Sequence, residues 1–116
     1  MEYKGSCHCG KIAYEVEGDL KEAMECNCSH CRRKGYLLWF LPREKLRLST
    51  PESALETYKF NKHVISHHFC AACGCAPFAT GTNPKIGQAT AAVNVHCLEG
   101  VEPRDLKIIP VDGRSL

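Results

Sequence analysis

Residues 26–31 read Cys-Asn-Cys-Ser-His-Cys, and a basic run follows at residues 32–34. One tight turn can direct the sulfur atoms of Cys26, Cys28 and Cys31 toward a single metal ion. A structural zinc ion is usually closed by four protein ligands, whereas a catalytic zinc keeps one position open for water or substrate. We call these three cysteines the three-cysteine site. They predict a metal site with three protein ligands, unless another part of the chain supplies a fourth ligand.

The chain holds nine cysteines in 116 residues, and its first five residues lack the apolar segment of a secretory signal. We therefore expect a cytoplasmic protein, and in a reducing compartment clustered cysteines indicate metal ligands or reactive thiols rather than disulfides. No apolar run is long enough to cross a membrane, so no membrane partner is expected. A net charge of +2 and a pI of about 8.1 argue against nucleic acid as the main partner.

Short stretches that read as strands, separated by turn residues, run through most of the chain. In residues 11–17 apolar side chains fall at every second position, which is typical of a half-buried strand. Residues 3–7 and 11–17 then form a hairpin with a cysteine pair at its tip. Turns or loops are expected at residues 61–62 and 81–84. Further strands are expected at residues 22–25, 36–41, 55–60, 64–69, 75–80, 88–95 and 106–111.

Helix signals are nearly absent from the sequence. The strands predict an all-β fold of small antiparallel sheets with little helix, in a single domain that spans residues 1–116. The apolar run at residues 36–41 is expected to be a buried strand, with Trp39 and Phe40 in the core rather than in a pocket wall. The cysteine turns lie at strand ends, where a bound metal can hold two sheets together.

Two cysteine turns supply a complete set of four ligands, the four-cysteine site. Cys7 and Cys9 lie at the hairpin tip, while Cys70 and Cys73 are separated by two residues and followed by Gly74, which lets backbone amides approach the sulfur atoms. Four thiolates saturate a tetrahedral zinc ion. This set predicts a closed site that ties the N-terminal hairpin to the middle of the chain.

A fourth ligand of the three-cysteine site is not settled by the sequence. Cys75 and Cys97 are interpreted as small buried hydrophobic residues, because unligated cysteine is among the most buried residue types. Lone histidines are more often hydrogen-bonded structural residues than ligands. The candidates that remain are Cys75, Cys97, His30, His67, His68 and His96.

Three stretches of the sequence carry a resemblance to a known family. They are residues 5–16, which begin Gly-Ser-Cys-His-Cys-Gly, residues 26–32, and residues 69–75, which read Phe-Cys-Ala-Ala-Cys-Gly-Cys. Residues 93–101 and the tail at residues 112–115, Asp-Gly-Arg-Ser, match the same pattern near its C-terminal end. In these motifs the chain resembles the glutathione-dependent formaldehyde-activating enzyme family, which also contains centromere protein V. The resemblance implies a β-tent fold whose small sheets are joined by zinc–cysteine turns.

The same resemblance implies a role for each cysteine cluster. It assigns a structural zinc to Cys7, Cys9, Cys70 and Cys73, and a catalytic zinc with an open position to Cys26, Cys28 and Cys31. Two zinc ions per chain are thus expected. If one of the two sites is only partly occupied, we expect it to be the three-cysteine site. The implied activity is addition of glutathione to formaldehyde, giving S-hydroxymethylglutathione, and the reverse reaction is that of a carbon–sulfur lyase. Because three thiolates weaken the Lewis acidity of zinc, we favour capture of the substrate thiol over polarisation of the aldehyde.

A small-molecule thiol such as glutathione is therefore the expected partner. Arg32 and Arg33 are candidates for binding its carboxylates, because a guanidinium suits bidentate contacts, and a solvated basic turn is the alternative interpretation. His30 is a candidate proton shuttle. The competing hypothesis is a non-catalytic zinc-binding module for a thiol metabolite or a protein partner. Nucleic-acid binding, by analogy with centromere protein V, has little support in a chain of such small net charge.

Overall fold

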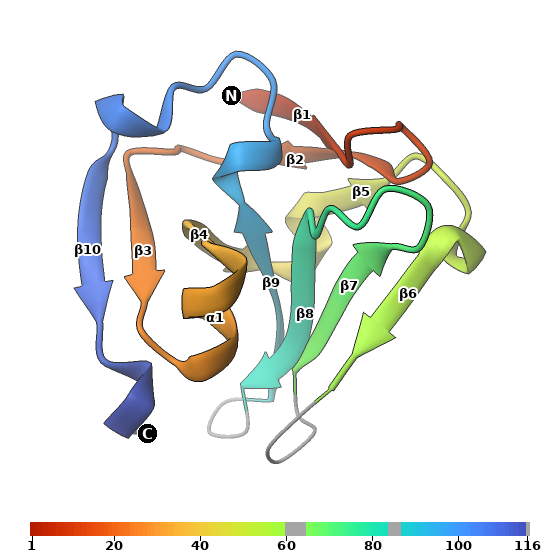
Figure 1. Ribbon diagram of the computed structural model, residues 1–116. Coiled ribbons are helices and arrows are strands. Elements are labelled where there is room, and N and C mark those ends of the chain that lie inside the picture. The colour runs from red at the N-terminus through yellow and green to blue at the C-terminus, as the bar shows by residue number, and fades with distance from the viewer. Residues whose placement is uncertain (60–64, 84–86, 116) are drawn as a thin grey trace.

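Two β-sheets and one short α-helix make up the described part of the chain, as Figure 1 shows. The computed structural model describes residues 1–59, 65–83 and 87–115. The strands are β1 (Glu2–Ser6), β2 (Ala13–Glu17), β3 (Glu22–Cys26), β4 (Leu38–Pro42), β5 (Leu46–Leu48), β6 (Leu55–Tyr58), β7 (Ser66–Cys70), β8 (Phe78–Asn83), β9 (Gln88–Asn94) and β10 (Lys107–Val111), and the helix is α1 (Ser29–Lys34). Single 3₁₀ turns occupy Arg43–Lys45, Glu52–Ala54, Val95–Cys97, Pro103–Asp105 and Gly113–Ser115. The predicted all-β class is confirmed.

The smaller sheet has the order β1-β2-β5 and is antiparallel throughout. Its β1–β2 hairpin is the predicted one, with Ser6 opposite Ala13 beside the cysteine turn. Alternation along β2 buries Tyr14 and Val16 against the larger sheet, while Glu15 lies on the other face. The strand is therefore half-buried, as its period of two predicts.

The larger sheet has the order β10-β3-β4-β9-β8-β7-β6. Its pairs are antiparallel except for β10 and β3, which run in the same direction. The β3–β4 pair is short, because only Met24 and Leu38 are register partners. A parallel pair needs a long crossover connection, and here most of the chain lies between the two strands.

The main core lies between the two sheets. Tyr14 packs edge-on against Phe78, with ring centroids 5.3 Å apart, and Tyr3 packs in the same way against Trp39 at 5.6 Å. The Tyr14 hydroxyl donates a buried hydrogen bond to the Pro77 carbonyl oxygen at 3.1 Å. Aromatic rings thus fix the smaller sheet on one face of the larger sheet, and the polar end of the buried tyrosine has a partner.

The opposite face of the larger sheet carries α1 (Figure 1), whose Cys31 packs there in a second apolar cluster. Register partners in neighbouring strands share a face of the sheet. The strand register therefore sets five residues of this face in one row: Phe40, Ala92, Ala79, His67 and Tyr58. Because the two alanines have small side chains, the middle of this row projects less from the sheet than the larger side chains on either side. No helix in the described ranges is long and apolar enough to cross a membrane.

A helix stands where a tight turn was expected after Cys28. The Cys28 sulfur accepts a hydrogen bond from the Cys31 amide at 3.2 Å, as the side chain of an N-cap residue does. Gly35 ends the helix in the left-handed conformation, with φ of 70°. Cysteine is not among the preferred N-cap residues, so the start of this helix carries no recognisable sequence signal.

Two further expectations are wrong. The loop expected at residues 81–84 is a strand as far as Asn83, because β8 continues its pairing with β9. Phe40, expected in the core, is 47% exposed, whereas its neighbour Trp39 is 9% exposed, since successive residues of a strand point to opposite faces. The turn expected at residues 61–62 lies outside the described residues.

Removal of the Tyr14 hydroxyl tests the packing between the sheets. We expect Tyr14→Phe to lower the free energy of unfolding by about 1 kcal/mol, because the Pro77 carbonyl loses one of its two donors and keeps the Asn94 amide. Tyr3→Phe is the matched control, since the Tyr3 ring makes an edge-on contact of the same kind from a less buried position. Denaturant titration at equal metal content measures both variants, and an equal loss in the two would contradict the assignment.

Candidate functional site

Four cysteine sulfur atoms from the two sheets converge at one point. Cys7 and Cys9 come from the turn after β1, while Cys70 ends β7 and Cys73 follows in the next turn. The sulfur atoms all lie within 4.8 Å of one another, with 3.7 Å between Cys7 and Cys9 and 3.5 Å between Cys9 and Cys70. Tetrahedral zinc, with bonds of about 2.3 Å, sets its sulfur ligands about 3.8 Å apart. The four-cysteine site therefore fits a zinc ion.

The local backbone prepares this site for a cation. Gly74 has φ of 80° and donates its amide to the Cys70 carbonyl oxygen at 2.8 Å, which closes the turn around Cys73. Hydrogen bonds from the backbone amides of Cys75 and Cys9 lower the pKa of the Cys73 thiol to about 5. A thiolate, the form that binds metal, is therefore favoured at this position.

The second group of thiols lies where β3 leads into α1. Cys26 ends β3, Cys28 caps α1 and Cys31 lies within the helix, and their three sulfur atoms are within 4.8 Å of one another. The Cys28 amide donates to the Cys26 sulfur at 3.5 Å, and the Cys31 amide donates to the Cys28 sulfur at 3.2 Å. Over the described ranges, no fourth histidine, cysteine, aspartate or glutamate joins the group. The three-cysteine site can thus give a metal three ligands and leave one position open.

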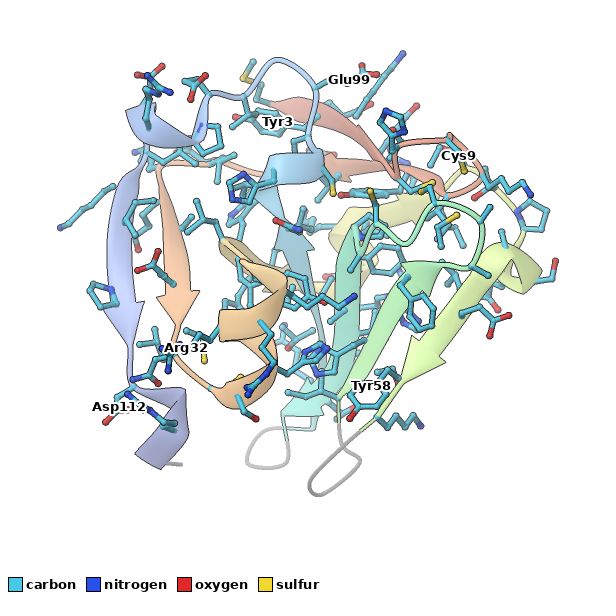
Figure 2. All side chains as sticks on the ribbon, in the orientation of Figure 1. Tyr3, Cys9, Arg32, Tyr58, Glu99 and Asp112 are labelled. Carbon is cyan, nitrogen blue, oxygen red and sulfur yellow. The ribbon has the colours of Figure 1, made fainter. Side chains whose placement is uncertain are left out.

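The two groups of thiols are separate sites. Figure 2 shows Cys9 at the hairpin tip, well away from Arg32, which follows Cys31 on α1. The four-cysteine site joins the sheets, whereas the three-cysteine site lies on the outer face of the larger sheet.

The three thiols of the second site differ in acidity. Burial opposes ionisation of Cys28, but hydrogen bonds from the Cys31 and His30 amides and from neighbouring thiols lower the pKa of Cys28 below its ordinary value. Burial raises the pKa of the Cys31 thiol well above its ordinary value. Cys28 therefore ionises more readily than Cys31, and a bound cation would favour the thiolate form of the buried Cys31.

The two remaining cysteines lie away from the three-cysteine site. Cys75 is half-buried and packs against the main core. Burial, together with the negative charges of Cys75 and Cys7, raises the pKa of Cys97 to about 11, so Cys97 lies on the side of the four-cysteine site. Both are half-buried rather than fully buried, and His96, a further ligand candidate, is exposed.

The other histidine candidates are not grouped with the three sulfur atoms either. His68 bridges β6 and β8, with one ring nitrogen 3.0 Å from the Thr57 hydroxyl and the other 2.8 Å from the Thr80 hydroxyl. His30 and His67 instead line a pocket beside the three-cysteine site. The structure therefore adds none of the candidate ligands to this site.

That pocket has a volume of about 460 Å³. It shares Tyr36 and Ala76 with the apolar cluster that contains Cys31. The other lining residues are His30, Arg33, Lys34, Tyr58, His67, His68 and Phe69. A molecule bound in the pocket would therefore lie next to the three-cysteine site.

Two histidines and two tyrosines form the aromatic wall of this pocket. The ring centroid of His30 lies 4.3 Å from that of His67, 5.6 Å from that of Tyr36 and 5.4 Å from that of Tyr58. Burial, followed by the positive charge of His30, lowers the pKa of His67 to about 4. Burial also lowers the pKa of His30. Both imidazoles are therefore mainly neutral at pH 7.

The tyrosines of this wall are not recognisable as pocket residues from the sequence. Alternation along residues 55–60 indicates a strand that carries Tyr58, but it does not tell which strand lies beside it. In the structure Tyr58 is the register partner of His67. Tyr36 reaches the same wall because α1 ends at Gly35 and turns the chain back over the sheet.

The structure separates the two arginines proposed for carboxylate binding. Arg33 lines the pocket and donates to the Ser29 carbonyl oxygen at 2.9 Å. Arg32 is exposed and is not among the lining residues. Lys34 also lines the pocket, with its ammonium nitrogen 5.7 Å from the centroid of the Phe69 ring. The cations nearest to a bound molecule are therefore Arg33 and Lys34.

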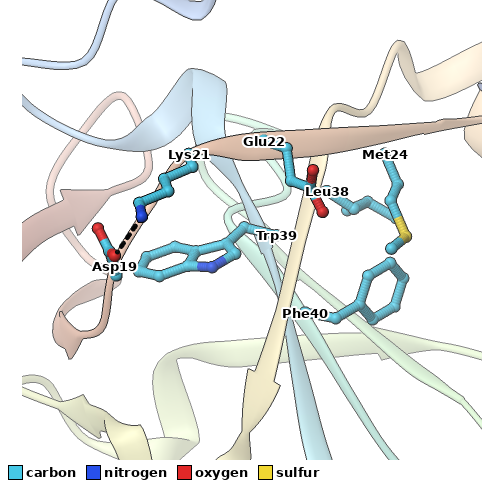
Figure 3. Close-up of a pocket in the computed structure, with 7 residues that line it drawn as sticks. All are labelled: Asp19, Lys21, Glu22, Met24, Leu38, Trp39 and Phe40. Carbon is cyan, nitrogen blue, oxygen red and sulfur yellow. Dashed lines mark ion pairs between the residues drawn. The ribbon is translucent and has the colours of Figure 1, made fainter. Parts of the chain in front are cut away.

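A second pocket, of about 350 Å³, lies where β3 and β4 diverge (Figure 3). Its residues are Asp19, Lys21, Glu22, Met24, Leu38, Trp39 and Phe40, with Lys21 paired to Asp19 at 3.3 Å. This lining contains no cysteine and no histidine. Neither group of thiols lines this second pocket, so the first pocket, which includes His30 from between Cys28 and Cys31, remains the candidate binding pocket.

Comparison with known proteins assigns the family. The model of the glutathione-dependent formaldehyde-activating enzymes matches residues 2–108. The chain belongs to this family. It is also similar to a protein of Rhodobacter sphaeroides whose crystal structure is known, with 36% sequence identity, coverage of 92% of this chain and 97% of that chain, and a TM-score of 0.79. The resemblance seen in the sequence is confirmed, and the family is one of enzymes that activate formaldehyde with glutathione.

The two cysteine sites predict different effects on stability. We expect Cys70→Ser to remove one metal ion per chain and to lower the melting temperature by more than about 10 °C, because the link between the sheets is lost. Cys28→Ser should also remove one ion, with a much smaller change in melting temperature. Metal analysis and thermal unfolding measure both effects, with Cys97→Ser as the control that keeps both ions. Equal thermal shifts in the two ligand variants would contradict this division of roles.

The lowered pKa of His67 predicts a loss of stability in acid. The unfolded chain protonates this residue near its ordinary value of about 6.5, whereas the folded chain does so only near 4. Stability contributed by the neutral form is therefore present above pH 6.5 and is lost as the pH falls toward 4. We expect the acid-side slope of unfolding free energy against pH to be shallower in His67→Gln than in the wild type. Identical slopes would show that His67 titrates normally.

Proposed function

We propose that this protein is a zinc-dependent enzyme that adds glutathione, or a similar small thiol, to formaldehyde and also catalyses the reverse, lyase reaction. The observation that carries the proposal is the three-cysteine site: three sulfur atoms within 4.8 Å, no fourth donor from the described residues, and a pocket of about 460 Å³ beside it. An open position next to a pocket is typical of catalytic rather than structural zinc. Membership of the family supports the substrate class.

The donor sets support zinc as the metal. Thiolate ligands favour zinc among the common divalent ions, and the sulfur spacing of the four-cysteine site fits it. Cys26, Cys28 and Cys31 would hold the second ion, and Cys28 ionises more readily than Cys31. When bound there, zinc supplies a positive charge that lowers the pKa of a substrate thiol. A protein so rich in thiols is best placed in a reducing compartment such as the cytoplasm.

The rim of the pocket supports a substrate that carries carboxylates. Arg33 and Lys34 bring two positive charges to it, and its described lining includes no aspartate or glutamate. Such a rim attracts and orients an anionic tripeptide. We interpret Arg32 as a solvated residue of α1, since it lies outside the lining.

Addition of a thiol to an aldehyde moves one proton from sulfur to the carbonyl oxygen, and we assign His30 to carry it. His30 lines the pocket and stands between Cys28 and Cys31 in the chain. A mainly neutral imidazole can accept the thiol proton at one nitrogen and deliver it to the former carbonyl oxygen, which becomes the hydroxyl of the product. His67, at 4.3 Å between ring centroids, holds the His30 ring in position and stays neutral because its pKa is about 4.

Replacement of one ligand separates catalysis from folding. We expect Cys28→Ser to lower turnover at least about 100-fold, because serine is a poor ligand for zinc, while the circular dichroism spectrum stays that of the wild type. Turnover is the rate at which the zinc-loaded protein forms the glutathione–formaldehyde adduct, followed by NMR exchange spectroscopy. Cys97→Ser, outside both sites, is the matched control and should keep the wild-type rate.

The competing hypothesis, a non-catalytic zinc-binding module, gives a different result in the same assay. It predicts stoichiometric binding of glutathione, or of a protein partner, with no acceleration over the spontaneous reaction. Either that result, or a fully zinc-loaded protein that neither binds nor accelerates, would refute the enzymatic proposal.

A further inference from the structure

The C-terminal end of the chain runs beside the three-cysteine site. β10 and β3 are parallel, and Val111 opposite Cys26 is the last pair of their register. Parallel strands leave a sheet at the same end, so the segment after Val111 continues next to the segment after Cys26. Figure 1 shows the C-terminal turn beside the loop that joins β3 to α1.

Asn27, which separates two of the cysteines, binds this tail. Its backbone amide donates to the Val111 carbonyl oxygen at 3.1 Å, and its side-chain amide donates to Asp112 Oδ1 at 2.9 Å. Its side-chain oxygen accepts a hydrogen bond from the Arg114 amide at 3.0 Å. A single residue of the cysteine turn is thus held at three points by residues 111–114.

Gly113 brings the tail into direct contact with the ligands. A Cβ atom at this position would collide with the Cys26 sulfur and would lie 3.3 Å from the Cβ of Cys28. Gly113 is not among the glycines with positive φ, so the close approach alone excludes a side chain here. The tail backbone therefore lies directly against Cys26.

We propose that Asp112, Gly113 and Arg114 are positioning residues of the three-cysteine site. They hold Asn27, fix the direction of the Cys26 sulfur and cover the site on its β10 side. The pocket lies toward β7 and β6, and none of these tail residues lines it. The inference rests on the metal-binding role proposed for the three cysteines.

The physical reason is the sensitivity of a metal site to the groups that orient its ligands. Loss of such an outer contact typically costs about 10–100-fold in metal affinity or activity. Here Cys26 also accepts a hydrogen bond from the Cys28 amide at 3.5 Å, so a shift of one sulfur disturbs the geometry of its neighbour. The tail contact thus acts on two of the three ligands.

Zinc release tests the inference, because the four-cysteine site serves as an internal reference. When the zinc-loaded protein is mixed with a chromogenic chelator, we expect Gly113→Ala to accelerate release from the three-cysteine site about 10–100-fold and to leave the other phase unchanged. Asp112→Ala removes the carboxylate that accepts the hydrogen bond of the Asn27 side chain and should accelerate the same phase about tenfold. Asp112→Asn keeps an oxygen acceptor and should restore slow release.

A second readout needs no metal. In the metal-free protein, alkylation of Cys26, measured by mass spectrometry, should be faster in Gly113→Ala and Asp112→Ala than in the wild type. Asp105→Ala, an exposed aspartate just before the other end of β10, is the matched control and should change neither readout.

Three outcomes would overturn the inference: equal acceleration of both zinc phases, Asp112→Asn as impaired as Asp112→Ala, or unchanged release and alkylation in all variants. Neither readout measures turnover, so this proposal and the proposed function can fail separately. A protein with tail-dependent zinc release and no turnover would keep the positioning role and reject the enzyme.

Discussion

The convergence of four cysteine sulfur atoms is the constraint on which the rest of the structure depends. It joins the tip of the β1–β2 hairpin to the end of β7, since Cys70 lies 61 positions after Cys9 in the chain. A cross-link that closes a long loop restricts the unfolded chain strongly, and a domain of this size gains only modest stability from its core. With the two sheets held together in this way, the outer face of the larger sheet is available for a site.

The two cysteine sites differ in how many ligands the protein provides and in what lies beside them. In the four-cysteine site the protein alone can fill all four ligand positions of a metal ion, and the two sheets meet there. The three-cysteine site stands on one loop and one short helix, and its neighbours are a pocket wall of histidine and tyrosine rings on one side and the C-terminal tail on the other. A metal held by three thiolates and a substrate thiol would complete the same set of four sulfur ligands that the first site has from the protein alone.

The sequence was sufficient to predict the groups whose members lie close together in the chain. The short spacings of Cys7 with Cys9, Cys70 with Cys73, and the cysteines of residues 26–31 indicated both sites, and alternation indicated most strands. Features that depend on long-range pairing could not be read in this way. The parallel β10–β3 pair, the pocket wall of Tyr36, Tyr58 and His67, and the contact of Gly113 with Cys26 all join segments whose proximity only the folded chain reveals. The helix at Ser29–Lys34 was missed for a local reason, because a cysteine caps it.

The most direct test of the central claim, that the three-cysteine site is open and binds a thiol, is a titration of the cobalt-substituted protein with glutathione. Cobalt bound by thiolates absorbs visible light, so each site reports on its own ligands. We predict a saturable change in the absorption of cobalt in the three-cysteine site, no change in that of the four-cysteine site, and no response in Cys28→Ser. A spectrum that glutathione leaves unaltered at full cobalt loading would contradict the claim.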